Sequence, residues 1–184
     1  KFFEMVIEEA QVRFHRDLPP TTVWRFRDAA VPRSQWPDFV LGPTFLARMV
    51  PHHHQGNLVR IHNQLPPNHV GSGHPDMTTH LHGTHSPALA DGFPEDTFFD
   101  GQPFRVVYRP GESFDYFYPQ TDVGVGIVGF GSGTPAPEER PSTLWYHDHL
   151  LDFTGPNNYR GLQGCYLVFD ELDSGDERDP NPAA

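Results

Sequence analysis

The stretch Leu-Trp-Tyr-His-Asp-His at residues 144–149 places two aromatic residues directly before a His-x-His pair. Because residues i and i+2 of a β-strand point to the same face, a strand over 143–149 would hold both imidazoles side by side. A second pair occurs upstream in Thr-His-Leu-His-Gly at 79–83, where a strand over 78–82 would end at the glycine. Two such strands facing each other would gather four imidazoles, so the sequence predicts a metal-binding pocket.

Further strands are predicted wherever short apolar or alternating runs lie between turns rich in Pro and Gly. They cover residues 1–16, 22–26, 45–50, 58–62, 104–108, 113–118 and 162–169. The segments 45–50 and 58–62 are expected to pair through a turn at 55–57. A Gly-rich loop is predicted at 124–137 and a helical turn within 150–160. With 20 Pro and 17 Gly residues the chain is too interrupted for a helical bundle. We therefore expect an all-β fold, an antiparallel Greek-key sandwich or a small barrel.

Charge and cysteine content argue against several classes of protein. The formal charge of −11 disfavours binding to nucleic acid or to an anionic membrane, and no apolar run approaches the length of a membrane span. The single cysteine, Cys165, excludes a disulfide framework and a Cys-rich zinc site. Twelve histidines bias any metal site toward imidazole ligands, which suit copper, zinc, iron or nickel.

The two His-x-His motifs, with Gly after the first and Trp-Tyr before the second, resemble the first two copper motifs of multicopper oxidases. The similarity covers roughly residues 5–172 and includes Phe-Val-Leu-Gly-Pro-Thr at 39–44, Ile-His-Asn-Gln-Leu-Pro at 61–66, Asp-Gly-Phe-Pro at 91–94 and Asn-Tyr-Arg-Gly-Leu-Gln-Gly at 158–164. Within the family, the chain is most similar to the branch of bacterial spore-coat laccases, bilirubin oxidases and phenoxazinone synthases. The resemblance implies a first cupredoxin domain, a cupredoxin-like Greek-key β-sandwich or barrel with long loops.

The resemblance also implies roles for individual residues. His80 would bind a type 2 copper. His82, His147 and His149 would bind a type 3 pair, and these three ions form the trinuclear cluster that reduces O2 to water. Asp91 matches an acidic residue that lies near this cluster in the family and assists proton delivery, a task that needs a nearby acid. The structural alternative for Asp91 is that its carboxylate only caps a turn, since Asp-Gly is a turn pair.

The remaining ligands of such a cluster come, in the family, from the last cupredoxin domain, whose motifs are absent here. A type 1 copper needs a Cys thiolate, two His and a weak axial ligand. Cys165 has no His within five residues on either side. We expect it to be a small buried residue of a packed strand.

The sequence therefore predicts a chain of three parts. Residues 1–38 form an N-terminal arm with strands that pack on the domain, 39–169 form the first cupredoxin domain, and 170–184 form an acidic linker toward a second domain. The expected cofactor is copper, with the type 1 ion outside this chain. Expected partners are the remaining cupredoxin domains, O2 and a small-molecule reductant such as a phenol, but neither nucleic acid nor a membrane. An extracytoplasmic location, or one on the spore or cell surface, is favoured over the cytoplasm.

Two other functions stay open on these grounds. One is a stand-alone domain that stores or delivers copper without oxidase activity. The other is a cupin-type dioxygenase, which also uses His-x-His on a strand but needs a Glu that is missing four residues after His82. Among the other residues near the motifs, His85 is expected in a loop and 52–54 in a surface turn. Asp148 points away from its two His neighbours and is expected to make a structural bond.

Overall fold

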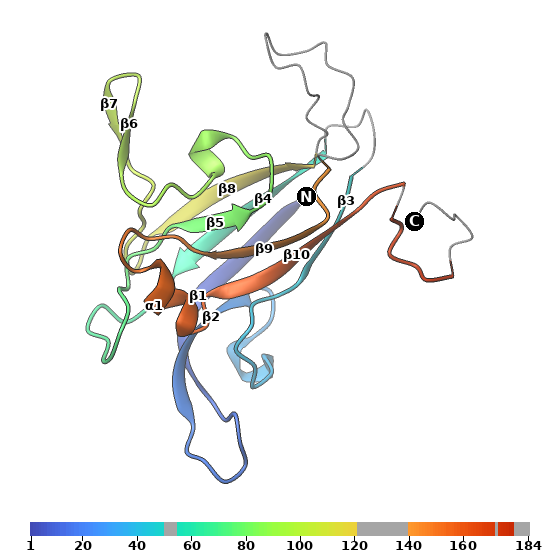
Figure 1. Cartoon of the computed structure of the whole chain (residues 1–184). Coiled ribbons are helices and arrows are strands. Elements are labelled where there is room, and N and C mark those ends of the chain that lie inside the picture. The colour runs from blue at the N-terminus through green and yellow to red at the C-terminus, as the bar shows by residue number, and fades with distance from the viewer. Residues whose placement is uncertain (50–54, 121–139, 172, 179–184) are drawn as a thin grey trace.

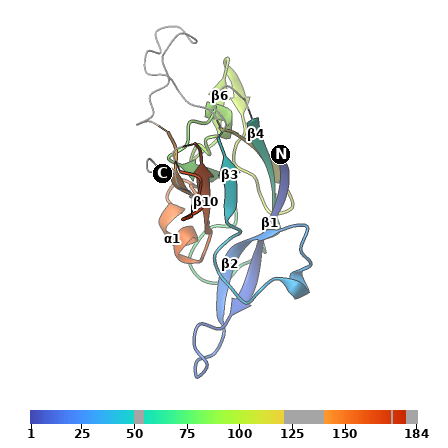
Figure 2. The same ribbon diagram turned by 90° about the vertical axis from the view of Figure 1, so that its right-hand side faces the viewer.

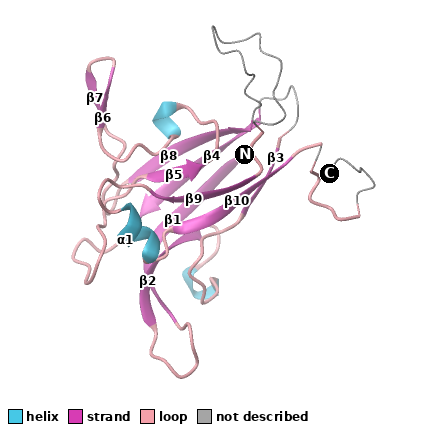
Figure 3. Ribbon diagram, in the orientation of Figure 1, coloured by secondary structure: helices cyan, strands magenta, loops and turns pink. Residues whose placement is uncertain are grey.

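Strands are the main regular elements of the computed structural model, which describes residues 1–49, 55–120, 140–171 and 173–178 (Figure 1, Figure 3). The strands are β1 (Phe2–Val12), β2 (Thr21–Asp28), β3 (Phe45–Arg48), β4 (Gln55–Asn63), β5 (Thr79–His82), β6 (Thr97–Phe99), β7 (Gln102–Phe104), β8 (Ser113–Gln120), β9 (Thr143–Asp148) and β10 (Gln163–Phe169). The helical elements are η1 (Arg33–Gln35), η2 (Ala88–Ala90) and α1 (Thr154–Tyr159). In this described part of the chain, no helix has the length and apolar character needed to cross a membrane. The expectation of an all-β protein is confirmed.

Eight of these strands form two four-stranded sheets, with the order β2-β1-β4-β8 in the first and β3-β10-β9-β5 in the second. Figure 2 shows the layers close to edge-on, with β1 and β4 on one side, β10 on the other, and α1 outside the second sheet. The pairing is mixed, because β1 runs parallel to β4 and β3 runs parallel to β10, whereas the other pairs are antiparallel. The fold is therefore a two-layer sandwich, but not the purely antiparallel one that the turn-rich sequence favoured.

One correction concerns the segments 45–50 and 58–62, which do not form a hairpin. β3 pairs with β10 in the second sheet, whereas β4 lies between β1 and β8 in the first. The expected turn at 55–57 is instead the start of β4. Because the two strands lie in opposite sheets, Phe45 and Val59 close the core from both sides, which two neighbouring strands of one sheet cannot do.

A second correction concerns 104–108, which was expected to be a strand. Only Phe104 belongs to one, at the end of the small β6–β7 hairpin that projects at the upper left of Figure 1. The backbone N–H groups of Val106 and Val107 both donate to the Asp96 carboxylate, at 3.0 Å each. Those donors are therefore satisfied by a side chain and are not available to a neighbouring strand.

The other predicted elements lie close to their expected places. The leading strand ends at Val12, earlier than the expected 1–16, and the helical turn expected within 150–160 is α1. The Gly-rich loop predicted at 124–137 lies outside the described residues. The division of the chain into an arm, a domain and a linker stays a prediction.

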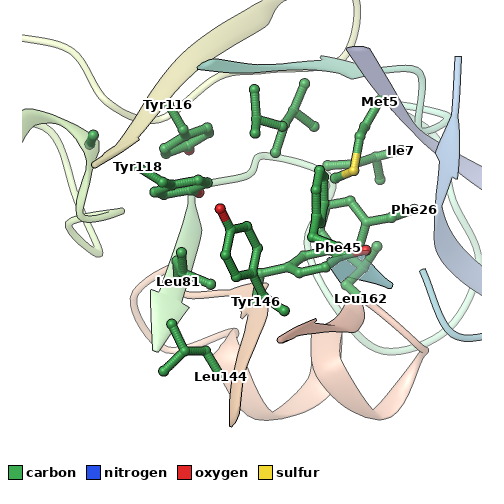
Figure 4. Close-up of a cluster of buried hydrophobic side chains, with 14 of the residues drawn as sticks. Met5, Ile7, Phe26, Phe45, Leu81, Tyr116, Tyr118, Leu144, Tyr146 and Leu162 are labelled. Carbon is green, nitrogen blue, oxygen red and sulfur yellow. The ribbon is translucent and has the colours of Figure 1, made fainter. Parts of the chain in front are cut away.

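Aromatic side chains from both sheets fill the space between the layers. Figure 4 shows Tyr116 and Tyr118 on the side of β8, with Tyr146 of β9 and Leu81 of β5 opposite them. The Tyr116 hydroxyl reaches across the core and accepts a hydrogen bond from the backbone N–H of Thr79 at 2.8 Å. This bond anchors the short strand β5 to the opposite sheet, directly before the first His pair.

Residues 1–38 supply two strands of the first sheet, and β1 lies in its interior between β2 and β4. On the outer face of this sheet, the buried Glu8 carboxylate accepts hydrogen bonds from Arg25 at 2.9 Å and from Arg27 at 3.2 Å. The Arg25 guanidinium also donates to the backbone oxygen of Pro37. These bonds hold the segment after β2 against the sheet and complete the burial of both arginines.

Candidate metal centre

Three of the four motif histidines lie on the neighbouring strands β5 and β9, at one edge of the second sheet, and His149 directly follows the end of β9. The antiparallel register places His80 directly opposite His147. Leu81 and Tyr146 alternate with these residues and are buried in the core. The imidazoles therefore project from the outer face of the sheet, and burial of the apolar neighbours in each motif determines that direction.

The four imidazoles that the sequence singles out form one cluster. Ligand nitrogens of His80, His82 and His147 all lie within 4.8 Å of one another, and His82 Nδ1 is 3.4 Å from His147 Nε2. The ring centroid of His149 is 5.1 Å from that of His80 and 5.6 Å from that of His147. Nitrogens at this spacing can serve as ligands of shared or adjacent metal ions.

Backbone carbonyls determine the tautomers of two of these rings. His80 donates its Nδ1–H to the carbonyl oxygen of Asp91. His147 donates its Nδ1–H to the carbonyl oxygen of Asp148 at 2.7 Å. Since each ring then carries its proton on Nδ1, the lone pair lies on Nε2, where a metal could bind it in place of the His82 contact that His147 makes here. Carbonyl partners of this kind are typical of metal-binding histidines, because they orient the ring before the ion arrives.

Burial keeps two of the imidazoles in the neutral form that binds metal. It lowers the pKa of His147 to about 4, the carbonyl of Asp148 opposes this change, and the neighbouring imidazoles add to it. Burial is also the largest cause of the lowered pKa of His149. At neutral pH both rings are therefore uncharged nitrogen donors, and protons compete little with a metal ion.

Asp148 lies between the two histidines of its motif and is fully buried. Its carboxylate accepts hydrogen bonds from the backbone N–H groups of Thr78 at 3.4 Å and Leu150 at 3.3 Å. It accepts a third bond, at 2.9 Å, from the side chain of Asn157. Burial raises the pKa of Asp148 to about 7 in spite of these three donors. The expectation that Asp148 makes structural bonds is confirmed, and its bond to Thr78 ties β9 to the start of β5.

Asp91 approaches His80 because the next residue, Gly92, allows two backbones to come close together. Gly92 has φ +76°, and a Cβ at this position would lie 2.1 Å from the carbonyl oxygen of Thr79. The Asp91 carboxylate lies 3.6 Å from His80 Nδ1 and accepts a hydrogen bond from the Ser86 hydroxyl at 3.0 Å. About half of the Asp91 side chain is exposed, so the carboxylate borders both the cluster and the solvent.

Other candidates from the sequence lie apart from this cluster. Cys165 was expected to be buried, but it is exposed, because Gly164 and Tyr166 occupy the inward positions of β10 and leave Cys165 on the outer face. His85 lies in the loop after β5, as expected. The histidines at 52–54 lie outside the described residues.

Sequence reasoning missed several side chains around the cluster. Asn157 and Asn158 come from α1 and contact Asp148 and His147 respectively. Asn158 begins the family-like stretch 158–164, but neither residue was expected at the metal site. Trp145 stacks on the ring of His147. A signal for Trp145 did exist, since a residue two positions before His147 on the same strand shares its face.

The donor chemistry of the cluster fits copper. Imidazole nitrogen is a good copper ligand, and two of the rings already present the nitrogen that a metal would use. Within the described residues, the group with converging ligand atoms is made of histidines alone. The Glu that a cupin-type centre needs is therefore not part of this group.

Two relatives of known identity match most of this chain. A laccase from Bacillus stratosphericus is 31% identical over 184 residues, which cover 94% of this chain and 30% of the laccase. A bilirubin oxidase from Albifimbria verrucaria is 33% identical over 129 residues, which cover 70% of this chain and 16% of that protein. The chain thus spans less than a third of the length of these relatives. No protein-family model matches it.

Solved structures agree on the fold. The 2F4 variant of the McoA multicopper oxidase from Aquifex aeolicus resembles this chain with a TM-score of 0.61 at 18% identity, over 95% of this chain and 28% of that one. This likeness confirms the expected cupredoxin-like β-sandwich. The two relatives above 30% identity show a common family as well as a common fold. This chain belongs to the multicopper oxidase family.

Proposed function

We propose that this chain is the N-terminal cupredoxin domain of a laccase-like multicopper oxidase, and that it supplies half of the histidine ligands of a trinuclear copper cluster. The observation that supports this most directly is the register of β5 and β9, which sets His80 opposite His147 with ligand nitrogens within 4.8 Å. The names of the relatives, laccase and bilirubin oxidase, support the same class of enzyme.

In this proposal each residue has a defined task. His80 would hold the type 2 copper, and His82, His147 and His149 would hold the type 3 pair. When bound, the three ions supply the electron transfer by which O2 is reduced to water. The carbonyls behind His80 and His147 keep the lone pair of each ring on Nε2, the nitrogen that would bind its ion. The partners are the remaining cupredoxin domains, which carry the other ligands and the type 1 copper, and a phenolic or similar reductant.

Asp91 is the proposed proton carrier. Its carboxylate is 3.6 Å from Nδ1 of His80 and is about half exposed, so it can take a proton from solvent and hold it beside the cluster. The Ser86 hydroxyl donates to the same carboxylate and orients it. The backbone carbonyl of Asp91, not its side chain, accepts the His80 proton, which separates ligand orientation from proton delivery.

A two-part experiment tests the proposal. The first part titrates this chain with Cu(II) by calorimetry, comparing His147→Ala with His62→Ala, a surface histidine that pairs with Glu4 away from the cluster. We expect His147→Ala to weaken binding at least about tenfold and His62→Ala to change it by less than about twofold. If both variants bind as the unchanged chain does, the cluster is not the copper site.

The second part measures oxygen consumption with a phenolic reductant in a protein that joins this chain to the remaining cupredoxin domains. We expect turnover that His80→Ala abolishes. Copper binding by the chain without oxygen consumption in the joined protein would instead favour storage or delivery of copper. An extracytoplasmic or surface location is proposed on the family resemblance alone.

A further inference from the structure

Trp145 packs against two of the clustered histidines at once. It lies directly opposite His82 in the β5–β9 register, and the two rings are stacked with centroids 5.5 Å apart and an interplanar angle of 22°. Its indole also stacks on His147, two residues along the same strand, at 4.0 Å and 25°. The indole therefore borders the rings of both strands.

His82 differs from His80 and His147 in what orients its ring. The rings of His80 and His147 each donate Nδ1–H to a backbone carbonyl. In the described part of the chain, the hydrogen-bonding contact of the His82 ring is with the imidazole of His147, and no carbonyl takes that place. The His82 ring also meets the His80 ring edge-on, with centroids 5.3 Å apart, but His80 is a proposed ligand too. The contact between His82 and His147 would be lost if both nitrogens bound a metal. The stack with Trp145 would remain, because Trp145 is not a proposed ligand.

We propose that Trp145 is a positioning residue for His82, in which a stacked indole takes the place of the carbonyls that orient His80 and His147. This inference rests on the proposed function, because it assigns His82 to a metal. Trp145 stacks on the rings of His82 and His147, and its indole N–H can only donate, so it would act on metal binding through the orientation of His82.

The physics favours a stack in this position. Aromatic pairs prefer offset stacking with centroids in the observed range, and they restrict the rotation of a partner that is otherwise exposed. A metal draws electron density from the imidazole that binds it, and an electron-poor ring is attracted to the electron-rich face of an indole. The stack is therefore stronger in the metal-bound state, which is the direction needed for a contribution to affinity.

The position of Trp145 makes the idea testable without loss of the fold. The indole is 38% exposed on the outer face of the sheet, whereas the core side of β9 is formed by Leu144 and Tyr146. Trp145→Ala therefore removes the stack and leaves the core unchanged. Trp145→Phe keeps an aromatic face. Leu46→Ala is the matched control, because Leu46 is an apolar residue, 68% exposed, on the other edge strand of this sheet.

The experiment titrates the whole chain with Cu(II) in a double-mutant cycle of Trp145→Ala and His82→Ala. We expect Trp145→Ala to weaken binding about tenfold, Trp145→Phe to restore it to within about threefold, and Leu46→Ala to have no effect. In the His82→Ala background, Trp145→Ala should then change affinity by less than about twofold. An equal loss in both backgrounds, or no loss in the first, would overturn the proposal. Unfolding midpoints of all variants verify the fold.

A second measurement needs no metal. Imidazole nitrogen resonances of the metal-free chain report the tautomer of each ring. Trp145→Ala should change the signals of His82 while those of His80 keep the Nδ1–H form; unchanged His82 signals would contradict the proposal. If the unchanged chain fails to bind Cu(II), the proposed function fails, yet this measurement still decides whether Trp145 orients His82.

Discussion

His80 and His147 are direct partners in the antiparallel pairing of β5 and β9, with ring centroids 5.5 Å apart. This relationship makes the cluster sensitive to register. A slip of one residue on either strand would exchange an imidazole for its neighbour on the other face, Leu81 or Asp148, and would separate the two His pairs. Bonds that fix the position of β5 are therefore as important to the site as the histidines themselves.

Gly92→Ala is expected to destabilise the protein more than Gly111→Ala does. Both glycines have a positive φ, +76° and +91°, so each Ala carries a similar backbone cost of about 1–2 kcal/mol. A Cβ at Gly92 would also meet the carbonyl oxygen of Thr79, whereas nothing lies within 4 Å of one at Gly111. Thermal unfolding of the two variants measures the difference. Equal midpoints would mean that the close approach of Gly92 to β5 does not contribute to the stability difference.

Asn157→Ala is expected to lower the free energy of unfolding by about 2–4 kcal/mol, because it leaves buried partners unsatisfied. The Asn157 amide donates to the Asp148 carboxylate at 2.9 Å and to the His74 carbonyl at 3.0 Å, and it accepts from the His74 N–H at 2.9 Å. Asn68→Ala, at an exposed position, is the control and should cost less than about 0.5 kcal/mol. Urea unfolding of both variants provides the comparison, and a similar loss in each would argue against the network.

Two acidic residues of the first sheet, Glu8 and Asp115, should differ strongly in what their loss costs in stability. Glu8→Ala leaves Arg25 and Arg27 buried without a counter-charge, and we expect a loss of about 3–5 kcal/mol. Asp115→Ala breaks a pair with Arg60 at 2.6 Å that is largely exposed, and we expect less than about 1 kcal/mol. The denaturant midpoints of the two variants test this difference in stability loss. Similar midpoints would mean that solvent reaches the Glu8 site.

Alkaline pH should weaken the anchor of β5. Burial raises the pKa of Tyr116 to about 12 from an ordinary value of 10. A raised folded-state pKa contributes stability that is complete below about pH 10 and is lost as the pH rises toward 12, because the unfolded chain ionises first. Tyr116→Phe lacks this group, so its deficit relative to the unchanged chain should shrink by about 1–3 kcal/mol between pH 9 and 12. Denaturant unfolding of both proteins across this pH range measures the difference in their free energies of unfolding. A difference that stays constant with pH would contradict a buried neutral hydroxyl at Tyr116.

Asp91→Asn separates ligand orientation from proton delivery. The carbonyl that accepts the His80 proton belongs to the backbone and remains, so Cu(II) binding by this chain should change by less than about twofold. In a protein with all its cupredoxin domains, oxygen consumption should fall at least about tenfold, because the amide cannot carry a proton. Full turnover would leave Asp91 with the structural role of a turn residue.

The sequence alone determined which residues could meet a metal and which face they would share. Both His pairs have the two-residue spacing that aligns side chains on a strand, and apolar neighbours such as Leu81 and Tyr146 leave one direction for the imidazoles. Two motifs with this spacing, flanked by Gly and by Trp-Tyr, were also enough to indicate the family. These features are local, so the chain carries them without reference to distant segments.

Only the tertiary structure decided which strands pair and what surrounds the histidines. The expected partnership of 45–50 with 58–62 was wrong, because strand pairing depends on burial summed over the whole sandwich and not on proximity in the chain. The Asp91 carbonyl behind His80, the Asn157 amide behind Asp148 and the buried hydroxyl of Tyr116 make contacts between separate elements of the fold. No periodicity encodes such contacts, since each depends on a backbone or side-chain group that the fold brings into reach.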